Sequence, residues 1–250
     1  MDHKQIAKHI PIVLFWIVVW QFTALLVHNP VLLVGPFETL RALVRLAQTG
    51  AFWRSAGHSF ARIFSGLVTG CFLGVVLASL GFRFPPVHTV CSPFVNALKS
   101  VPVACFVVML LLWAGKAQTT VIVTAIVVFP ILYFNTYQGL LAADRELIDI
   151  ASMFTMTNAD RVRHIYLPAL FPYLISAVRI ACGMSWKSGV AAEVIALQKD
   201  TLGNSLNTAR TLLETDTVFA VTLTVILFSV LTEKILLSLL KRIGRRYDPM

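Results

Sequence analysis

Three charged side chains mark an apolar stretch in the last third of the chain, residues 170–192, and they are the groups best suited to act on a solute. Arg179 and Lys187 lie inside the stretch, and Glu193 follows it. Residues seven apart turn an α-helix by about 700°, so Arg179, Trp186 and Glu193 form one stripe, with Lys187 about 80° from Arg179. Charged groups within apolar helices generally face a bundle interior or a water-filled cavity. We predict that these four residues line a path for a solute, and the positive charge favours an anion such as nitrate, a sulfonate or bicarbonate.

A purely structural role is the alternative for the same charges. Arg179 can pair with an acid of a loop, or extend its side chain towards the membrane surface. Glu193 can pair with Lys187 or with Lys199, which are close in sequence. The sequence leaves both interpretations open.

Metal, disulfide and nucleotide chemistry find no support in the residue spacing. The four cysteines lack a CxxC pair, and the six histidines are scattered without ligand spacing. The one Gly-Lys pair, Gly115-Lys116, lacks both the upstream glycine and the following Ser or Thr of a phosphate-binding loop. We therefore predict no metal site, no bound cofactor and no catalytic residue, so that the chain is not itself an enzyme.

A long polar stretch, residues 142–164, has the features of a protein-docking element. Its charged residues are Asp144, Arg145, Glu146, Asp149, Asp160, Arg161 and Arg163. Helical spacing predicts a helix over 146–156, followed by a second helix that Thr157 or Asn158 would cap. Pro168 is expected to end this second helix, because proline disfavours helical backbone in the residue before it.

The apolar residues of the first of these helices share one face. They are Leu147, Ile150, Ala151 and Phe154. An apolar face bordered by charges suits a groove on a soluble partner. The alternative is an inert amphipathic loop that rests on lipid headgroups.

The elements that position these residues are expected to be membrane helices. The 250 residues are 57% hydrophobic and 13% charged, with a mean hydropathy of +0.78, whereas soluble domains are about 25% charged. One helical crossing takes about 20 apolar residues. We predict an all-α integral membrane protein with about six transmembrane helices, the first retained because no signal-peptide cleavage site follows it. The apolar runs are 10–27, 60–82, 101–113, 117–137, 170–192 and 218–240.

Two patterns describe how these runs are joined and packed. Glu38, Arg41, Arg45 and Arg54 are spaced as on a short amphipathic surface helix. The second run carries glycine at positions 66, 70 and 74, a spacing that permits close helix packing in lipid. Glycine is also common in membrane helices, so the spacing alone does not decide whether the packing occurs.

The distribution of Lys and Arg orients the chain with both termini in the cytoplasm. This orientation places 11 basic residues inside and seven outside, and it puts residues 142–164 in the cytoplasm. Glu233 and Lys234 in the last run are expected to pair near the cytoplasmic surface. Because the bases follow the ends of apolar runs, we expect no nucleic-acid partner. The bases assigned to the inside are Lys4, Lys8, Arg83, Lys99, Arg145, Arg161, Arg163, Lys241, Arg242, Arg245 and Arg246.

The polar stretch resembles the EAA loop of ABC-importer permeases. That pattern is Glu-Ala-Ala, three residues, Gly, nine residues and Ile-x-Leu-Pro. Here the matching positions keep the spacing, but an acid and two other residues differ: Asp149 replaces Glu, Ile150 replaces Ala and Thr155 replaces Gly. The loss of the glycine predicts an altered turn, because glycine adopts a positive φ at little cost and threonine does not. The resemblance assigns a coupling role to Asp149, Ile150, Ala151, Thr155, Ile165, Leu167 and Pro168.

Further motifs extend the resemblance over about 220 residues, to permeases of the nitrate/sulfonate/taurine type. They include Lys99-Ser100-Val101-Pro102, Phe129-Pro130-Ile131, Ala191-Ala192-Glu193 and Leu202-Gly203. The resemblance implies a type I importer permease in a bacterial inner membrane. Residues 1–56 would add a transmembrane helix and an outer amphipathic segment to a core of residues 57–250, whose coupling loop spans 142–168.

The same resemblance implies the partners. The chain would pair as a homodimer surrounded by membrane lipid, and two copies of a cytoplasmic P-loop ATPase would bind ATP and Mg. An extracytoplasmic solute-binding protein would deliver the solute. Two other classes stay open. A secondary transporter would show broken helices, inverted repeats and midplane acids. A membrane-embedded enzyme would use the cluster of Asp144, Glu146, Asp149 and His164.

Overall fold

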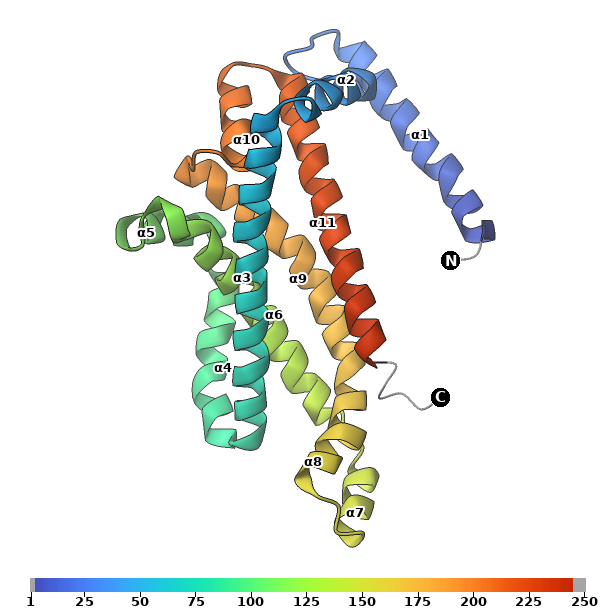
Figure 1. Ribbon diagram of the computed structural model, residues 1–250, viewed down its shortest axis with the longest axis vertical. Helices are drawn as coiled ribbons and strands as arrows, with labels where there is room; N and C mark the ends of the chain where they lie inside the picture. Colours follow the sequence, from blue (N-terminus) through green and yellow to red (C-terminus); the bar gives the residue numbers. More distant parts are fainter. Residues whose placement is uncertain (1–2, 245–250) are drawn as a thin grey trace.

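The computed structural model describes residues 3–244, and the side chains of residues 11–244. Over this range the chain folds into helices without a strand (Figure 1). In order they are α1 (His3–Val27), α2 (Pro36–Ala47), α3 (Gly50–Arg83), α4 (Pro85–Ser100), α5 (Val103–Trp113), α6 (Gly115–Leu141), α7 (Arg145–Met153), α8 (Asn158–Arg161), a π-helical turn (Val162–Tyr166), α9 (Leu167–Ala196), α10 (Leu202–Thr211) and α11 (Thr215–Gly244).

Four of the described helical segments are long and apolar enough to cross a membrane. They contain α3, α6, α9 and α11, and the bent pair of α4 and α5 could supply a fifth span. The apolar part of α1, Pro11–Val27, is shorter. The all-α membrane fold is as predicted, whereas length and composition support four or five spans in place of the predicted six.

The predicted third span, residues 101–113, is not a crossing by itself. Its helical part, α5, has only 11 residues and is bent by 103° from α4. Val101 is extended, as proline favours in the residue before it, and the new helix begins at Val103, directly after Pro102. The chain therefore rises along α4 and then turns across the bundle, as Figure 1 shows.

The glycine spacing in α3 does support close helix packing. A Cβ added at Gly66 would lie 2.6 Å from the Val121 carbonyl oxygen, and one at Gly70 would lie 2.8 Å from that of Ala125. One at Gly74 would lie 2.7 Å from the Cβ of Leu132. Such small residues let two backbones approach in lipid. The resulting pair of α3 and α6 forms a buried core with α9.

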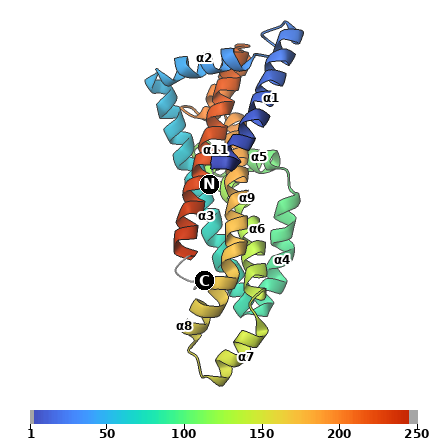
Figure 2. The same cartoon turned by 90° about the vertical axis from the view of Figure 1, so that its right-hand side faces the viewer.

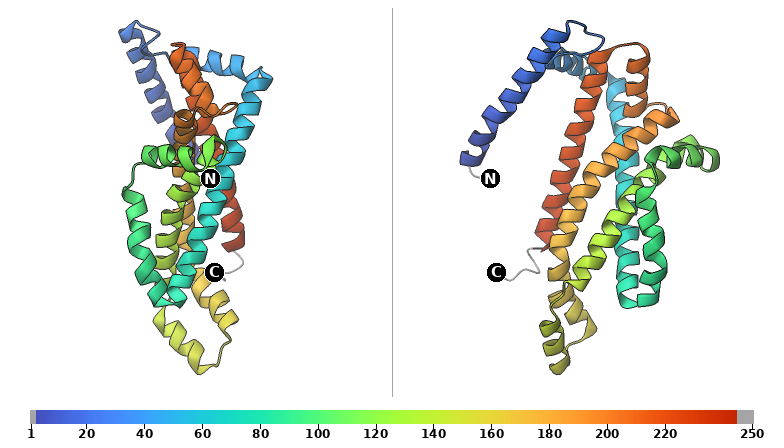
Figure 3. Two further views of the ribbon diagram at one scale, coloured as in Figure 1. Left: turned by 90° about the vertical axis from the view of Figure 1, so that its left-hand side faces the viewer. Right: turned by 180° about the vertical axis from the view of Figure 1, so that it is seen from behind.

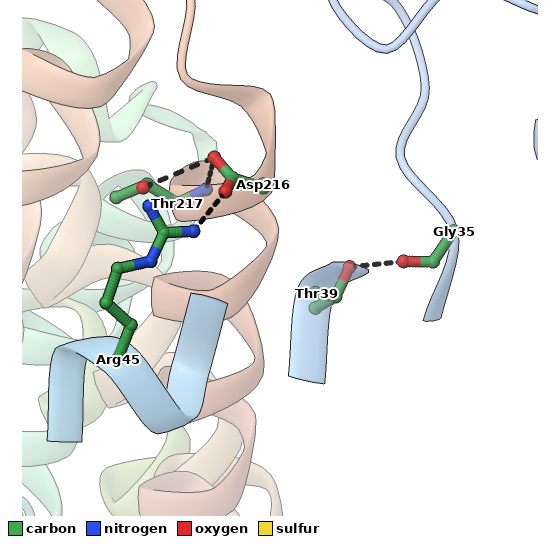
Figure 4. Close-up of polar contacts among 5 residues, drawn as sticks. All are labelled: Gly35, Thr39, Arg45, Asp216 and Thr217. Carbon is green, nitrogen blue, oxygen red and sulfur yellow. Dashed lines mark hydrogen bonds and ion pairs between the residues drawn. The ribbon is translucent and has the colours of Figure 1, made fainter. Parts of the chain in front are cut away.

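The predicted amphipathic surface helix is α2, but it ends before Arg54, which belongs to α3. One polar contact joins it to α11 at one end of the bundle, and another closes its first turn (Figure 4). Arg45 donates to the Asp216 carboxylate at 2.7 Å, at the start of α11. At the other end of α2, the Thr39 hydroxyl donates to the Gly35 carbonyl at 2.9 Å.

The two ends of the bundle differ in what they carry. The α7–α8 segment extends beyond one end, and α2 and α10 lie at the other, as Figures 2 and 3 show. The end of α11 points towards the end that carries α7 and α8. This arrangement is consistent with the predicted orientation, in which the loop and the C-terminus share one side, but the orientation stays a prediction. Lys99 was assigned to the inside, but it lies within α4, near the end that joins α5, and not in a loop between helices. Arg245 and Arg246 lie outside the described residues.

Replacing Gly66 with alanine should destabilise the protein. The new Cβ would meet the Val121 carbonyl, so α3 and α6 must separate, and overpacking of this kind generally costs about 1–3 kcal/mol. The measurement is the melting temperature of the detergent-solubilised chain. Gly57→Ala in the same helix is the matched control, because nothing lies within 4 Å of its added Cβ. If both variants melted alike, the close-packing interpretation would be wrong.

Candidate functional site

A tight turn joins α7 to α8 and is built as a helix-ending Schellman motif. The Met156 amide donates to the Ala151 carbonyl at 3.0 Å, and the Thr155 amide donates to the Ser152 carbonyl at 3.3 Å. In this motif the residue after the helix adopts the left-handed conformation and is usually glycine. Thr155 occupies that position with φ +51°. A β-branched residue therefore adopts the positive φ that glycine usually supplies in this turn, and an altered bend relative to the family stays a prediction.

The second short helix is capped by Thr157, one of the two predicted residues. Its hydroxyl oxygen accepts from the Asp160 amide at 3.2 Å and the hydroxyl donates to the Asp160 carboxylate at 2.6 Å. The prediction that Pro168 ends this helix is wrong, because a continuous helical segment runs from Asn158 to Ala196. The π-helical turn accommodates the proline: the Leu167 amide donates to the Val162 carbonyl, five residues back.

The predicted coupling residues divide into an outer and an inner set. Asp149 and Ile150 are exposed, as is Thr155. Ala151 and Ile165 are buried together inside the loop, which corrects the prediction that Ala151 belongs to the exposed apolar face. Leu167 and Pro168 are half-buried at the start of α9.

The exposed face of α7 is nevertheless strongly apolar. Met153 is 80% exposed and Phe154 is 76% exposed, and Leu147 and Ile150 add to the same tip. An exposed apolar surface of this kind, bordered by charge, marks an interaction site. It is placed at the far end of the molecule from α2, as Figure 2 shows.

The residues predicted to line a path on α9 lie in different surroundings. The Arg179 guanidinium lies 3.5 Å from the Glu233 carboxylate of α11, so Glu233 pairs with Arg179 and not with Lys234 as predicted. Trp186 is buried, stacks on Phe228 and donates its indole N–H to the Thr232 hydroxyl at 3.2 Å. Within the described residues, Lys187 is exposed and no ion pair is recorded for it.

Glu193 is fully buried and holds α10 to α3. One carboxylate oxygen accepts from the Ser59 hydroxyl at 2.7 Å and from the Gly203 amide at 3.1 Å. The Ser59 oxygen in turn accepts from the Leu202 amide at 2.8 Å. A Cβ at position 203 would overlap the Glu193 side chain, so only glycine fits there. The alternative pairing of Glu193 with Lys187 or Lys199 is not found.

Gln198 was not predicted from the sequence, and it joins the end of α9 to α3 and α6 beside this cluster. Its side-chain oxygen accepts from Arg62 at 3.0 Å and from the Thr120 hydroxyl at 2.8 Å. Its side-chain nitrogen donates to the Lys116 carbonyl. A single glutamine after a helix carries no motif, and only the left-handed Leu197 before it aims the side chain inward.

Comparison with known proteins gives this arrangement a family. Residues 66–245 match the family described as binding-protein-dependent transport system inner membrane component, and the chain belongs to it. The taurine transport system permease protein TauC of Escherichia coli is 24% identical over 90% of this chain and 83% of its own length. SsuC of the same organism, named for aliphatic sulfonates transport, is 26% identical over 87% of this chain and 82% of its own.

Solved structures agree on the fold. An inward-facing structure of the MetNI methionine ABC transporter matches with a TM-score of 0.57 at 19% identity, over 84% of this chain and 97% of that one. The protein is thus an ABC-importer permease of the nitrate/sulfonate/taurine type and a multi-pass inner-membrane protein. The α4–α5 break is the kind of feature expected of a secondary transporter, but the family match decides for the importer class.

Removing the Glu193 carboxylate should destabilise the end of the bundle that carries α10. Glu193→Ala leaves the Ser59 hydroxyl and the Gly203 amide without their acceptor, and each buried unpaired group costs about 1–3 kcal/mol. The melting temperature in detergent should fall markedly for Glu193→Ala. It should fall less for Glu193→Gln, because the side-chain oxygen of glutamine can accept the same hydrogen bonds. Glu214→Ala, at an exposed acid of the same end, is the control. A Glu193→Ala protein as stable as this control would contradict the assignment.

Restoring glycine at Thr155 should stabilise the loop. A non-glycine residue in the left-handed region costs about 1–2 kcal/mol, and Thr155→Gly removes that strain. Amide hydrogen exchange of residues 145–161 should slow in this variant. Ser152→Gly in α7 should do the opposite, because glycine costs about 1 kcal/mol within a helix. Faster exchange after Thr155→Gly would show that the threonine itself stabilises the turn.

Proposed function

We propose that the chain forms, as a homodimer, the membrane path of an importer for a small anionic solute, driven by two copies of a cytoplasmic P-loop ATPase. ATP and Mg would bind to the ATPase, and a solute-binding protein would deliver the solute from outside. The observation that carries the proposal is the exposed apolar tip of α7. It stands clear of the apolar spans, and a tight turn joins it to α8, which is continuous with α9.

The tip has the composition of a docking knob. Met153 and Phe154 would enter an apolar groove, and Asp149 would lie at its rim, where charge sets orientation. The capped α8 and the Schellman turn fix the tip in one conformation before docking. Less conformational entropy is therefore lost when the partner binds.

A rigid connection carries the motion of the tip into the membrane. The helical segment Asn158–Ala196 has 39 residues, which corresponds to about 58 Å of helix. It begins beside the tip, passes Lys187 and ends at the Glu193 cluster that holds α10. A displacement of α7 and α8 by the ATPases would therefore move both ends of the proposed path together.

The solute class rests on the relatives and on the charges of the spans. TauC is named for taurine and SsuC for aliphatic sulfonates, and both solutes carry a sulfonate. Arg179 is neutralised by Glu233, and Trp186 is buried in the protomer, so Lys187 is the member of the predicted stripe with an uncompensated exposed charge. An exposed ammonium on a membrane helix favours an anion in a water-filled path.

Charge reversal at the rim of the knob should uncouple the importer. We expect Asp149→Lys to reduce ATP-driven solute uptake at least about tenfold, because an unfavourable interfacial charge costs several kcal/mol. Phe154→Ser should go further and release the ATPase from purified complexes, because it removes a central apolar anchor. Uptake into membrane vesicles and the ATPase recovered per permease are the measurements.

Leu212→Ser is the matched control for the knob. Leu212 is also exposed, but it follows α10 at the opposite end of the bundle, so its loss should leave the ATPase bound. If Phe154→Ser kept its ATPase and its uptake, the docking role of α7 would have to be abandoned.

A further inference from the structure

Lys99 lies at the level of the apolar spans, although it is a charged residue. It is the fifteenth residue of α4, about 21 Å along the helix from Pro85. α4 runs back along α3 from their shared turn, and Gly81 of α3 faces His88 of α4. α3 itself is about 51 Å long, and the apolar layer of a membrane is about 30 Å thick. Wherever such a layer is placed along α3, it reaches the level about 21 Å from the shared turn, which is the level of Lys99.

Its surroundings provide no counter-ion. The ammonium nitrogen lies 3.6 Å from the centre of the Phe134 ring of α6, and Lys99 has no ion pair among the described residues. The acids in the apolar spans are Glu193, which is fully buried, and Glu233, which pairs with Arg179. A second copy of the chain would therefore bring no free acid of its spans to Lys99.

A pocket of about 160 Å³ opens beside Lys99 at the α4–α5 break. Apolar side chains form its walls, among them Phe106 of α5, Pro130 of α6 and Met184 of α9. Lys187 is three residues beyond Met184, about 60° short of a full turn of α9, so a second exposed cation lies on the adjoining face. The pocket thus combines one fixed positive charge with an apolar lining.

We propose that Lys99 binds the anionic group of the transported solute at the α4–α5 break, with the apolar walls contacting its aliphatic part. This assignment rests on the proposed importer function and names its solute class: a small organic anion such as an alkanesulfonate. Charges at membrane depth mark substrate paths, and an ammonium with an unused coordination sphere supplies the attraction.

The Phe134 ring explains how such a site can also release its solute. A cation over an aromatic face is stabilised by roughly 0.5–2 kcal/mol, so the empty ammonium has a resting position. The solute must displace that contact, which keeps its binding weak enough for passage, as conduction through a pore requires. Because α5 is joined to α4 only through the extended Val101, a shift of α9 against α5 would change the pocket at its hinge.

The test is uptake of radiolabelled ethanesulfonate by cells that express the complete importer, with its own ATPase and solute-binding protein. Lys99→Met keeps the length of the side chain and removes the charge, and uptake should fall at least about tenfold, the effect of losing one charge-assisted hydrogen bond. Lys99→Arg should retain most of the uptake. Assembly with the ATPase should stay unchanged in both variants. Lys199→Met, at an exposed lysine beyond α9, is the control.

A second variant keeps the test independent of folding. Lys99→Cys, in a background with Cys105→Ala, should react with the water-soluble reagent 2-sulfonatoethyl methanethiosulfonate, because the proposed path brings water to position 99. No labelling in any nucleotide state would place position 99 in lipid and overturn the proposal.

The remaining outcomes separate this inference from the function it rests on. Wild-type uptake by Lys99→Met would overturn the assignment of Lys99. A wild-type importer that carries another solute with ATP but rejects ethanesulfonate would overturn the anion site and leave the importer function intact. A wild-type chain that carries nothing with ATP and binds no ATPase would overturn both.

Discussion

The close approach of α3 and α6 is the constraint on which the rest of the structure depends. In a membrane an apolar helix surface is already in contact with apolar lipid, so its burial against another helix supplies little free energy. Helix association then depends on close packing of the two backbones. Gly66, Gly70 and Gly74 provide that approach, and α9 packs into the same core. Because α9 is fixed there and continues without interruption through the π-helical turn into α8, the exposed α7 tip is held rigidly to the membrane core.

The second constraint is the cost of charge and unpaired polar groups away from water. The structure reduces it by pairing Arg179 with Glu233, and by giving one carboxylate oxygen of Glu193 a hydroxyl and a backbone amide as donors. Lys99 and Lys187 are left exposed on helices that enter the membrane. These two cations have no ion pair among the described residues, which is a reason to place a water-filled path, and an anion, beside them.

Much of this could be predicted from the sequence because the determinants are local. Apolar runs gave the long helices, the spacing from Asp149 to Pro168 gave the loop and its family, and Thr157 was one of two candidates for the cap. What failed depended on tertiary context. A proline was expected to stop the helix at Pro168, but a π-helical turn absorbs it, whereas Pro102 does break the chain between α4 and α5. Sequence spacing also could not tell that Ala151 faces inward, that Glu193 binds Ser59 and Gly203, or that Gln198 joins the end of α9 to α3 and α6.

The central claim is that this chain moves a solute only when an ATPase works on its α7–α8 segment. Affinity purification of the chain from its native membrane, with mass spectrometry of what accompanies it, tests that claim most directly. The account predicts a P-loop ATPase at about one copy per permease, together with ATP-dependent solute uptake by the same complex. A chain that purifies alone and moves its solute in vesicles without ATP would contradict the account.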